Sequence, residues 1–265
     1  HTDIKMIYYG HDLHFMREFR EYELTGDVKK RQESEYWKSI EFSLFHKVEV
    51  SYYPSYVEEE AIHAVDETIP VKAITAYVYE EFLQNLNKDF AKREGLLFVG
   101  GFAHPPNADA VLWFAKEVFP KIREQIKVNF YIVGSKVTDE IKALEQPGNG
   151  IIVKGFVSEE ELADLYRNCR IVVVPLRYGA GVKGKVVEAI YNGAPIVTTS
   201  VGSEGIPEVE KVLLVEDQPD EFAETVVELY NDEKRLEDLA EKTQVYIREH
   251  FSIDAAWDVI KEDFE

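Results

Sequence analysis

Short apolar runs alternate with amphipathic segments along the chain from Gly95 onward. The apolar runs predict strands at residues 96–99, 128–133, 150–154, 171–176, 195–199 and 212–215. Apolar residues at helical spacing predict helices at residues 108–125, 158–168, 184–192, 219–230, 234–249 and 253–264. This alternation indicates a doubly wound α/β domain with a parallel sheet. The run 171–176 is the most apolar, as expected of a central strand that is buried on both faces.

The first part of the chain has a less regular pattern of the same kind. Strands are predicted at residues 4–9, 48–53 and 71–78, and helices at residues 34–46 and 55–64. A charged stretch, residues 80–94, joins this part to the second domain, with 85–94 as the linker. A complete nucleotide-binding α/β domain needs roughly 100–150 residues. We therefore expect the first lobe, residues 1–84, to be incomplete, as in a fragment of a longer protein.

The net negative charge of the chain argues against one class of partner, the nucleic acids. The formal net charge of the 265 residues is −20. A nucleic-acid partner needs a basic surface that displaces counterions, so we expect none here. Any anionic ligand then needs a site that is locally basic or rich in amide donors.

Several features bear on location. The chain has no run of roughly 18 apolar residues, so no transmembrane helix is expected. Its first residues lack the layout of a signal peptide, and no strong basic amphipathic helix indicates membrane association. The lone Cys169 fits a reducing compartment. We predict a cytoplasmic protein.

Glycine recurs where the predicted strands end. Five strand ends are followed by Gly100-Gly101-Phe102, Gly134-Ser135, Gly155-Phe156-Val157, residues 177–181 and residues 199–202. Ligands of open parallel sheets bind outside the carboxyl ends of the strands. Glycine allows close approach of the backbone there. The sequence therefore predicts a pocket floored by backbone.

The stretch 175–195 carries the most specific chemistry. A glycine-bearing loop leads into a helix whose first turn holds Lys183 and Lys185. Unpaired amides and the helix dipole make such an N-terminus a site for a phosphate or diphosphate, to which Arg177 would add charge. Glu188 is placed to accept hydrogen bonds from a diol such as ribose. The alternative is that Lys185 and Glu188 only pair with each other on the helix face.

Residues 188–197, EAIYNGAPIV, resemble the signature of the retaining GT-B glycosyltransferases of group 1, which carry E-x7-E. The resemblance implies that Glu188, the second glutamate, contacts the ribose. The first glutamate is absent, because its position is Ala180. The loop is similar to a G-x-G-V-K-x-K-V-x-E-A version, which implies that its lysines bind the donor phosphates. The loop residues expected to contact the donor are Gly179, Ala180, Gly181, Val182 and Lys183.

Other landmarks of the family follow in order. Residues 98–107 resemble the first glycine loop of the donor domain, with Gly100, Gly101 and Phe102 expected at the donor and His104 in place of a basic residue. Residues 153–157 resemble the segment that reads the nucleobase, and the expected contacts there are Gly134, Gly155, Phe156 and Val157. Residues 198–205 resemble the loop that closes the pocket floor, and residues 251–265, around Trp257, the helix that returns to the first lobe. The resemblance is specific over 95–265 and looser over 1–84.

Histidines follow the first predicted strand. Related enzymes place a histidine there, facing the donor sugar across the cleft, which makes His11 the candidate and His14 the second choice. The alternative is that His11, Asp12 and His14 form a loop-capping cluster without a ligand. Histidine and carboxylate are also common zinc ligands, but there is no helical pair of ligands and no nearby cysteine, so no metal is expected. Arg17 and Arg20 lie beyond this cluster in sequence.

The resemblance implies a GT-B fold of two Rossmann-like, doubly wound lobes with a cleft between them, in which residues 95–250 bind a nucleotide-sugar. The implied reaction transfers the sugar of a nucleoside diphosphate donor, with retention of configuration, to an unknown sugar, lipid or protein acceptor. No metal and no cofactor are expected, because Lys183, Lys185, Arg177 and loop amides would stabilise the leaving diphosphate. The residues assigned to catalysis are His11, Lys185 and Glu188.

Other functions remain open. The same scaffold also serves nucleotide-sugar epimerases, which need no acceptor. It serves phosphorylases as well, which need pyridoxal phosphate and a lysine that binds it, and no such lysine site can be identified in the sequence. A non-catalytic module that binds a nucleotide-sugar, or a scaffold, is favoured a little by Ala180 and the short first lobe. Slow hydrolysis of a donor would argue against such a module. The sequence is also compatible with a fragment that is inactive alone although the whole protein is an enzyme.

Overall fold

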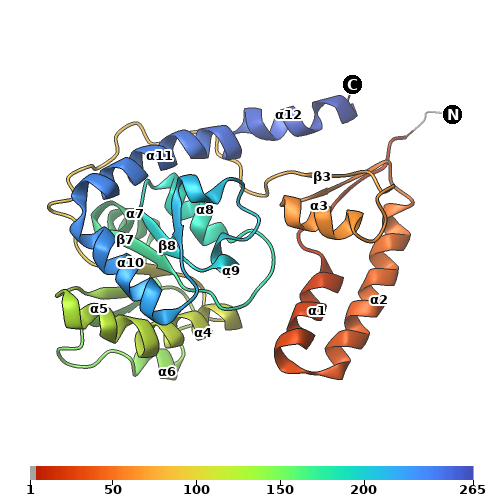
Figure 1. Cartoon of the computed structure of the whole chain (residues 1–265). Helices are drawn as coiled ribbons and strands as arrows, with labels where there is room; N and C mark the ends of the chain where they lie inside the picture. Colours follow the sequence, from red (N-terminus) through yellow and green to blue (C-terminus); the bar gives the residue numbers. More distant parts are fainter. Residues whose placement is uncertain (1–3, 265) are drawn as a thin grey trace.

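The computed structural model describes residues 4–264, apart from the side chain of Leu24, and contains two parallel sheets (Figure 1). The larger sheet has six strands in the order β6-β5-β4-β7-β8-β9. Its strands are β4 (Leu96–Val99), β5 (Phe130–Val133), β6 (Ile151–Gly155), β7 (Ile171–Val174), β8 (Ile196–Thr198) and β9 (Leu213–Val215). Every residue of β7 is buried, as predicted for the central strand. The α/β class with parallel sheets is thus confirmed.

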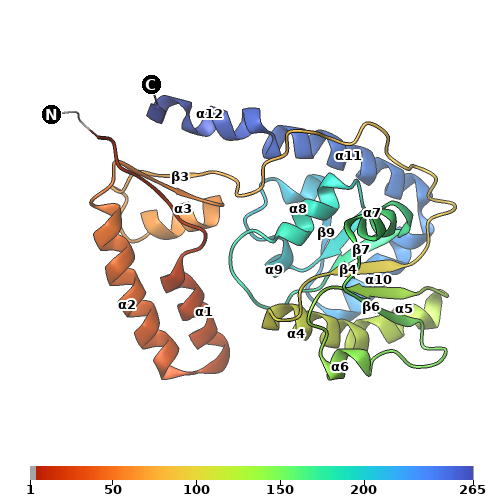
Figure 2. The same cartoon turned by 180° about the vertical axis from the view of Figure 1, so that it is seen from behind.

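Helices cover both faces of the larger sheet (Figure 2). One face carries α4 (Pro105–Trp113), α5 (Phe119–Gln125), α6 (Asp139–Lys142) and α10 (Pro219–Asn231). The other carries α7 (Glu159–Asn168), α8 (Gly184–Tyr191) and α11 (Glu233–Phe251). The short helix α9 (Ser200–Ser203) and a 3-10 turn (Val209–Lys211) lie between β8 and β9. Ser158 begins α7 as predicted, because its hydroxyl accepts a hydrogen bond from the Glu161 amide.

The single helix predicted at 108–125 is wrong in two respects. Helix starts earlier, at Pro105, and a π-helical turn at Phe114–Val118 separates α4 from α5. Pro120 explains the interruption, because it has no N–H to donate to the preceding turn. The earlier start fits Pro105 and Pro106 at the first helical positions, where a missing N–H costs nothing.

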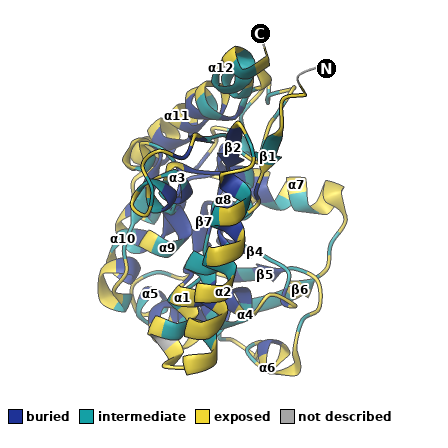
Figure 3. Cartoon of the chain, turned by 90° about the vertical axis from the view of Figure 1, so that its right-hand side faces the viewer, coloured by how far each residue is buried: buried dark blue, intermediate teal, exposed yellow. Residues whose placement is uncertain are grey.

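The first lobe is a smaller parallel unit. Its sheet has the order β1-β2-β3, formed by β1 (Ile7–Tyr9), β2 (Val50–Tyr53) and β3 (Val71–Ala73). Its helices are α1 (His14–Thr25), α2 (Val28–Phe45) and α3 (Tyr56–His63). A separate apolar core holds it together, with Tyr53, Phe45 and Ile62 fully buried. Buried residues concentrate in β2, whose four residues are all buried, whereas most residues of α2 are exposed and most of α1 are half-buried (Figure 3).

The first lobe also corrects the sequence prediction. Helix α1 was not predicted, α2 begins at Val28 rather than at residue 34, and β3 ends at Ala73 rather than at residue 78. Gly26, with φ at 71°, ends α1 in the left-handed conformation and allows α2 to fold back beside it. The two helices form a hairpin that extends away from the sheet (Figure 1).

The last helix, α12 (Ile253–Phe264), extends from the second lobe toward the first (Figure 1). Near its end, the Asp263 carboxylate accepts a hydrogen bond of 2.5 Å from the Tyr52 hydroxyl and pairs with Lys72 at 2.6 Å. These contacts join the two lobes at the side opposite the α1–α2 hairpin. No helix within residues 4–264 is long and apolar enough to span a bilayer.

Candidate functional site

The glycine loops at the carboxyl ends of β4, β5 and β6 lie side by side. The Gly100 amide donates to the Val133 carbonyl at 2.9 Å, and the Gly134 amide donates to the Gly155 carbonyl at 2.8 Å. Gly134 has φ at 157° and Gly155 has φ at 69°. A Cβ at Gly134 would collide with the Gly100 carbonyl, so the approach of these loops requires glycine. Three predicted glycines therefore meet at one edge of the sheet.

The aromatic residues of these loops have contrasting environments. Phe102 is 4% exposed, and its ring stacks on Phe98 with 6.2 Å between centroids. It therefore supports the first glycine loop from within the core. Phe156 is 82% exposed, which leaves its ring free at the predicted nucleobase end of the edge. Val157 beside it is half-buried.

The N-terminus of α8 carries two largely buried lysines. Lys183 is the N-cap residue; its ammonium donates to the Gly181 carbonyl and lies 3.4 Å from a Glu204 carboxylate oxygen. Lys185 donates to the Asn107 side chain and lies 4.9 Å from the centroid of the Phe98 ring. Lys185 thus contacts the first glycine loop, and the alternative of an ion pair with Glu188 is not what the structure gives.

Burial changes the acidity of both lysines. It lowers the pKa of Lys183, although Glu204 opposes the shift. Burial, and then repulsion by Lys183, lower the pKa of Lys185 to about 8. Two ammonium groups that are desolvated and mutually repelling favour an anion between them. This corner of the sheet edge is therefore locally basic in a strongly acidic protein.

Three cavities meet at the loop that precedes α8, and Tyr178 and Gly179 line all of them. The smallest, about 200 Å³, lies within the second lobe and is lined by Lys183, Lys185 and His104. The other two lie between the lobes. One has about 780 Å³ and is lined by Asp12, Arg17, Arg20, Glu21, His104, Asp109, Arg177 and Ala180, among others. The other has about 500 Å³ and is lined by Arg20, Glu23, Tyr56, Arg177, Ser200 and Glu204, among others.

Arg177 lines the two cavities between the lobes, but it is paired with Asp109, a residue that the sequence did not indicate. Two guanidinium nitrogens bind the Asp109 carboxylate, one of them at 2.9 Å. This hydrogen bonding raises the pKa of Arg177. The pair is 68 positions apart in sequence, so no local pattern predicts it.

Glu188 lies on the side of α8 that faces α7 and the segment before the linker, and it does not line these three cavities. Burial raises its pKa, and the Glu188 charge in turn contributes to the raised pKa of Tyr166 and Tyr79. Tyr79 stacks on Tyr191 with 4.1 Å between centroids. The carboxyl group is thus half-buried among phenol groups.

Tyr77 is a further residue that the sequence did not single out. Its hydroxyl lies beside Gly184, where a Cβ would approach it to 2.6 Å. Burial raises the pKa of Tyr77, and the Gly184 amide opposes that shift. The first turn of α8 is therefore covered by a residue from the segment that leads to the linker.

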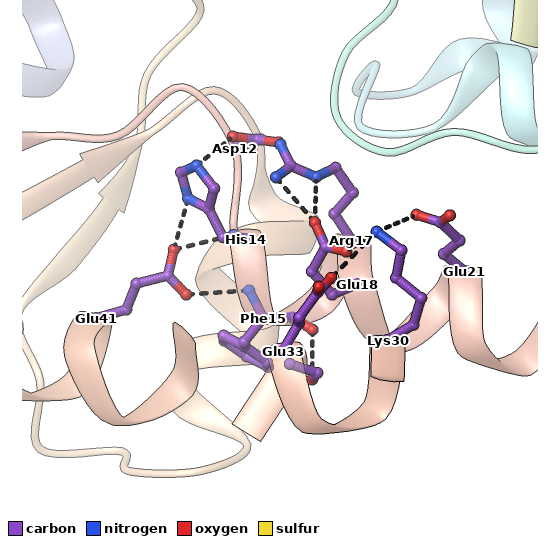
Figure 4. Close-up of polar contacts among 10 residues, drawn as sticks. Asp12, His14, Phe15, Arg17, Glu18, Glu21, Lys30, Glu33 and Glu41 are labelled. Carbon is purple, nitrogen blue, oxygen red and sulfur yellow. Dashed lines mark hydrogen bonds and ion pairs between the residues drawn. The ribbon is translucent and has the colours of Figure 1, made fainter. Parts of the chain in front are cut away.

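The two candidate histidines of the first lobe differ in their environment. The Glu41 carboxylate accepts hydrogen bonds from the backbone amides of His14 and Phe15 at 2.9 and 3.2 Å (Figure 4). It also contacts the His14 ring at 3.1 Å, and this ring stacks on Trp37 with 4.5 Å between centroids. His14 therefore lies at the N-terminus of α1, where the capping carboxylate is Glu41, a residue outside the predicted cluster of His11, Asp12 and His14. Neighbouring Asp12 binds Arg17 at 2.6 Å.

His11 is exposed in the loop after β1, and its ring packs against the edge of Tyr9 with 5.4 Å between centroids. It does not line the three cavities, although Asp12 beside it does. Its predicted contact with the donor sugar remains a prediction.

Comparison with known proteins gives the family of this chain and its relatives. The family described as glycosyl transferases group 1 matches residues 93–232. An uncharacterised 44.6 kDa protein of the cps region of Klebsiella pneumoniae is 33% identical over 136 residues, which are 49% of this chain and 33% of that protein.

Solved structures share the fold over nearly the whole chain. S. aureus TarM, in a complex that includes UDP, has a TM-score of 0.74 at 15% identity and covers 100% of this chain and 52% of its own. Sucrose-phosphate synthase from Thermosynechococcus elongatus has a TM-score of 0.72 at 17% identity, covering 97% of this chain and 66% of its own. Anabaena Alr3699/HepE in complex with UDP has a TM-score of 0.70 at 14% identity, covering 98% and 72%.

These likenesses establish the architecture. The structural neighbours are GT-B glycosyltransferases, and the larger sheet with its glycine edge is the Rossmann-like lobe of that fold. The chain spans about a third of the Klebsiella protein and about half of TarM. More than half of its residues fall within the matched family region. The chain belongs to the glycosyl transferases group 1 family.

Proposed function

We propose that this chain binds a nucleoside diphosphate sugar and forms the donor part of a retaining glycosyltransferase. The observation that carries the proposal is the pair of largely buried lysines at the N-terminus of α8, beside the glycine loop that follows β4. Membership of the family and the UDP complexes of TarM and Alr3699/HepE support it.

In this proposal the diphosphate binds at the first turn of α8. The dipole of α8 favours negative charge at this end, and Lys183 and Lys185 supply positive charge. Both lysines already contact polar oxygen atoms, of Glu204 and Asn107, which a phosphate can replace. Charge that develops on the leaving diphosphate would meet these preorganised groups, so transfer does not require a metal in this proposal. Arg177 would take part only after it leaves Asp109.

The nucleoside would extend along the glycine edge toward β6. Glu188 would accept hydrogen bonds from the ribose hydroxyls, and the backbone of Gly155 and Val157 would read the base. The exposed ring of Phe156 lies at the same end of the edge. The transferred sugar would occupy the 780 Å³ cavity beside Ala180, with the acceptor entering from the first lobe near His11.

Calorimetric titration with UDP, GDP, ADP and dTDP tests the donor site. We expect one nucleotide to bind selectively, and Glu188→Ala to weaken its binding about tenfold or more, because the ribose hydroxyls lose hydrogen bonds to a charged carboxylate that are worth roughly 1.5–3 kcal/mol. Glu224→Ala, at an exposed position of α10, is the matched control and should leave binding unchanged. Equal loss in both variants, or no loss in either, would reject the ribose assignment.

A non-catalytic module that binds a nucleotide-sugar is the second candidate. It is favoured by Ala180 at the position of the first glutamate and by the pairing of Arg177 with Asp109, which reduces the free positive charge in the cavity. Hydrolysis of the bound donor distinguishes the two functions. A retaining transferase hydrolyses its donor slowly without an acceptor, whereas a module that only binds leaves the donor intact.

A further inference from the structure

One carboxylate links the two lobes at the edge of the proposed donor site. Glu204 follows the short helix α9 of the second lobe. One of its oxygens lies 2.5 Å from the Arg20 guanidinium of α1, and the other lies 3.4 Å from the Lys183 ammonium. Only 15% of the Glu204 side chain and 10% of the Lys183 side chain are exposed. The Glu204 carboxylate therefore forms an ion pair with one cation from each lobe, at a position that is largely shielded from water.

Arg20 differs from the other arginines that line these cavities. Arg17 binds Asp12 and Glu18, which both belong to its own lobe. Arg177 binds Asp109 through two nitrogens within the second lobe. For Arg20, the ion pair that the structure gives within residues 4–264 is the one with Glu204, across the cleft. Release of Glu204 would thus leave an arginine of the first lobe facing the lysine that begins α8.

The bridge has the chemistry of a phosphate site. A carboxylate and a phosphate group both present neighbouring oxygens to cationic donors, and the planar guanidinium fork binds either of them. A diphosphate carries more charge than one carboxylate, so it competes for Lys183 and Arg20 on favourable terms. Glu58 adds a second carboxyl group near Lys183, but burial raises its pKa and disfavours its charged form. Glu204 is therefore the anion that an incoming phosphate must displace.

We propose that Arg20 is a phosphate-binding residue that the first lobe contributes to the donor site, and that Glu204 occupies its place when no donor is bound. This inference rests on the proposed function and adds a ligand from the opposite lobe. Binding of the donor exchanges the Glu204 carboxylate for the terminal phosphate of the diphosphate. The same exchange places a first-lobe cation on the phosphate that is released when the sugar is transferred.

The test compares nucleoside diphosphate with monophosphate on the wild type, three variants of the bridge and one control variant. The probes are UDP, GDP, ADP and dTDP and their monophosphates, titrated into the wild type and into Glu204→Gln, Arg20→Gln and Arg20→Lys. We expect Glu204→Gln to bind the preferred diphosphate several-fold more tightly, because the competing carboxylate is removed. Arg20→Gln should bind it about tenfold more weakly with the monophosphate unchanged, and Arg20→Lys should recover part of the loss. Arg31→Gln, at an exposed position of α2, is the control and should behave as the wild type.

The ratio of the two affinities separates this role from a structural one. If Arg20→Gln keeps the diphosphate-to-monophosphate ratio of the wild type, or Glu204→Gln binds the diphosphate no more tightly, the inference is overturned while the donor site stands. A merely structural loss would lower the affinities of both nucleotides together and lower Tm. If no nucleotide binds the folded wild type, the proposed function itself fails, and the role of Arg20 fails with it.

Discussion

At the scale of single residues, the charge of the candidate donor site depends on how far its side chains are buried and on which partners they contact. Lys183 and Lys185 were predicted from their place at the first turn of a helix, and both lie there, largely but not fully buried. Their partners Glu204 and Asn107 are 21 and 78 positions away in sequence, and Asp109 is 68 positions from Arg177. Such pairs depend on how separate loops meet, and a local pattern carries no information on that.

The lowered pKa of Lys185 predicts how nucleotide binding depends on pH. Its ammonium is protonated below about pH 8 and loses its charge above that value. A diphosphate binds the charged form, so its affinity should be constant below pH 8 and fall by up to about tenfold per pH unit above it. Lys185→Arg should reduce this fall to the part that Lys183 contributes, because a guanidinium stays charged while the pKa of Lys183 is also lowered by burial. Titrations between pH 6.5 and 9.5 check the profile, and a wild-type affinity that rises or stays level above pH 8 would contradict it.

At the scale of elements, most of the second lobe was readable from the sequence. Strand–helix alternation and glycine at the strand ends predicted the parallel sheet and the edge where the loops meet. Helix α1 was missed because its cap is not local. Its first amides bind Glu41, which lies 27 residues away in α2, and no side chain at its own N-cap, Leu13, accepts a hydrogen bond. The π-helical turn at Phe114–Val118 shows a similar limit, since periodicity alone predicts a continuous helix.

Because the glycine loops pack against each other, we expect that adding one methyl group at Gly134 lowers the free energy of unfolding strongly. Gly134→Ala would place a Cβ against the Gly100 backbone, at a φ of 157° that other residues rarely adopt. We expect a loss of about 2 kcal/mol or more, which is a Tm lower by roughly 4–8 °C. Gly148→Ala is the matched control, because Gly148 has φ at 81° but no atom within 4 Å of its Cβ position. Thermal denaturation of both variants checks this, and equal losses would show that loop contact is not the cause.

At the scale of the whole molecule, two parallel α/β units face each other across cavities that both of them line. The sequence predicted the two lobes and the cleft, but not which residues of the first lobe reach it. Arg20 and Asp12 line the 780 Å³ cavity, whereas His14 supports the cap of α1. The position of α1 decides this, and that helix was absent from the prediction. A residue can therefore be assigned to the cleft from the sequence only when the helix or strand that carries it has been predicted.

The central claim is that a donor diphosphate binds at the N-terminus of α8. A rival basic cavity of about 730 Å³ lies at the opposite edge of the same sheet and is lined by Arg123, Lys127 and Lys142. Titration of the preferred nucleoside diphosphate into Lys185→Gln and Lys142→Gln compares the two sites directly. The account predicts a loss of about tenfold or more in Lys185→Gln and wild-type affinity in Lys142→Gln. Unchanged binding in Lys185→Gln, with the loss in Lys142→Gln instead, would contradict it.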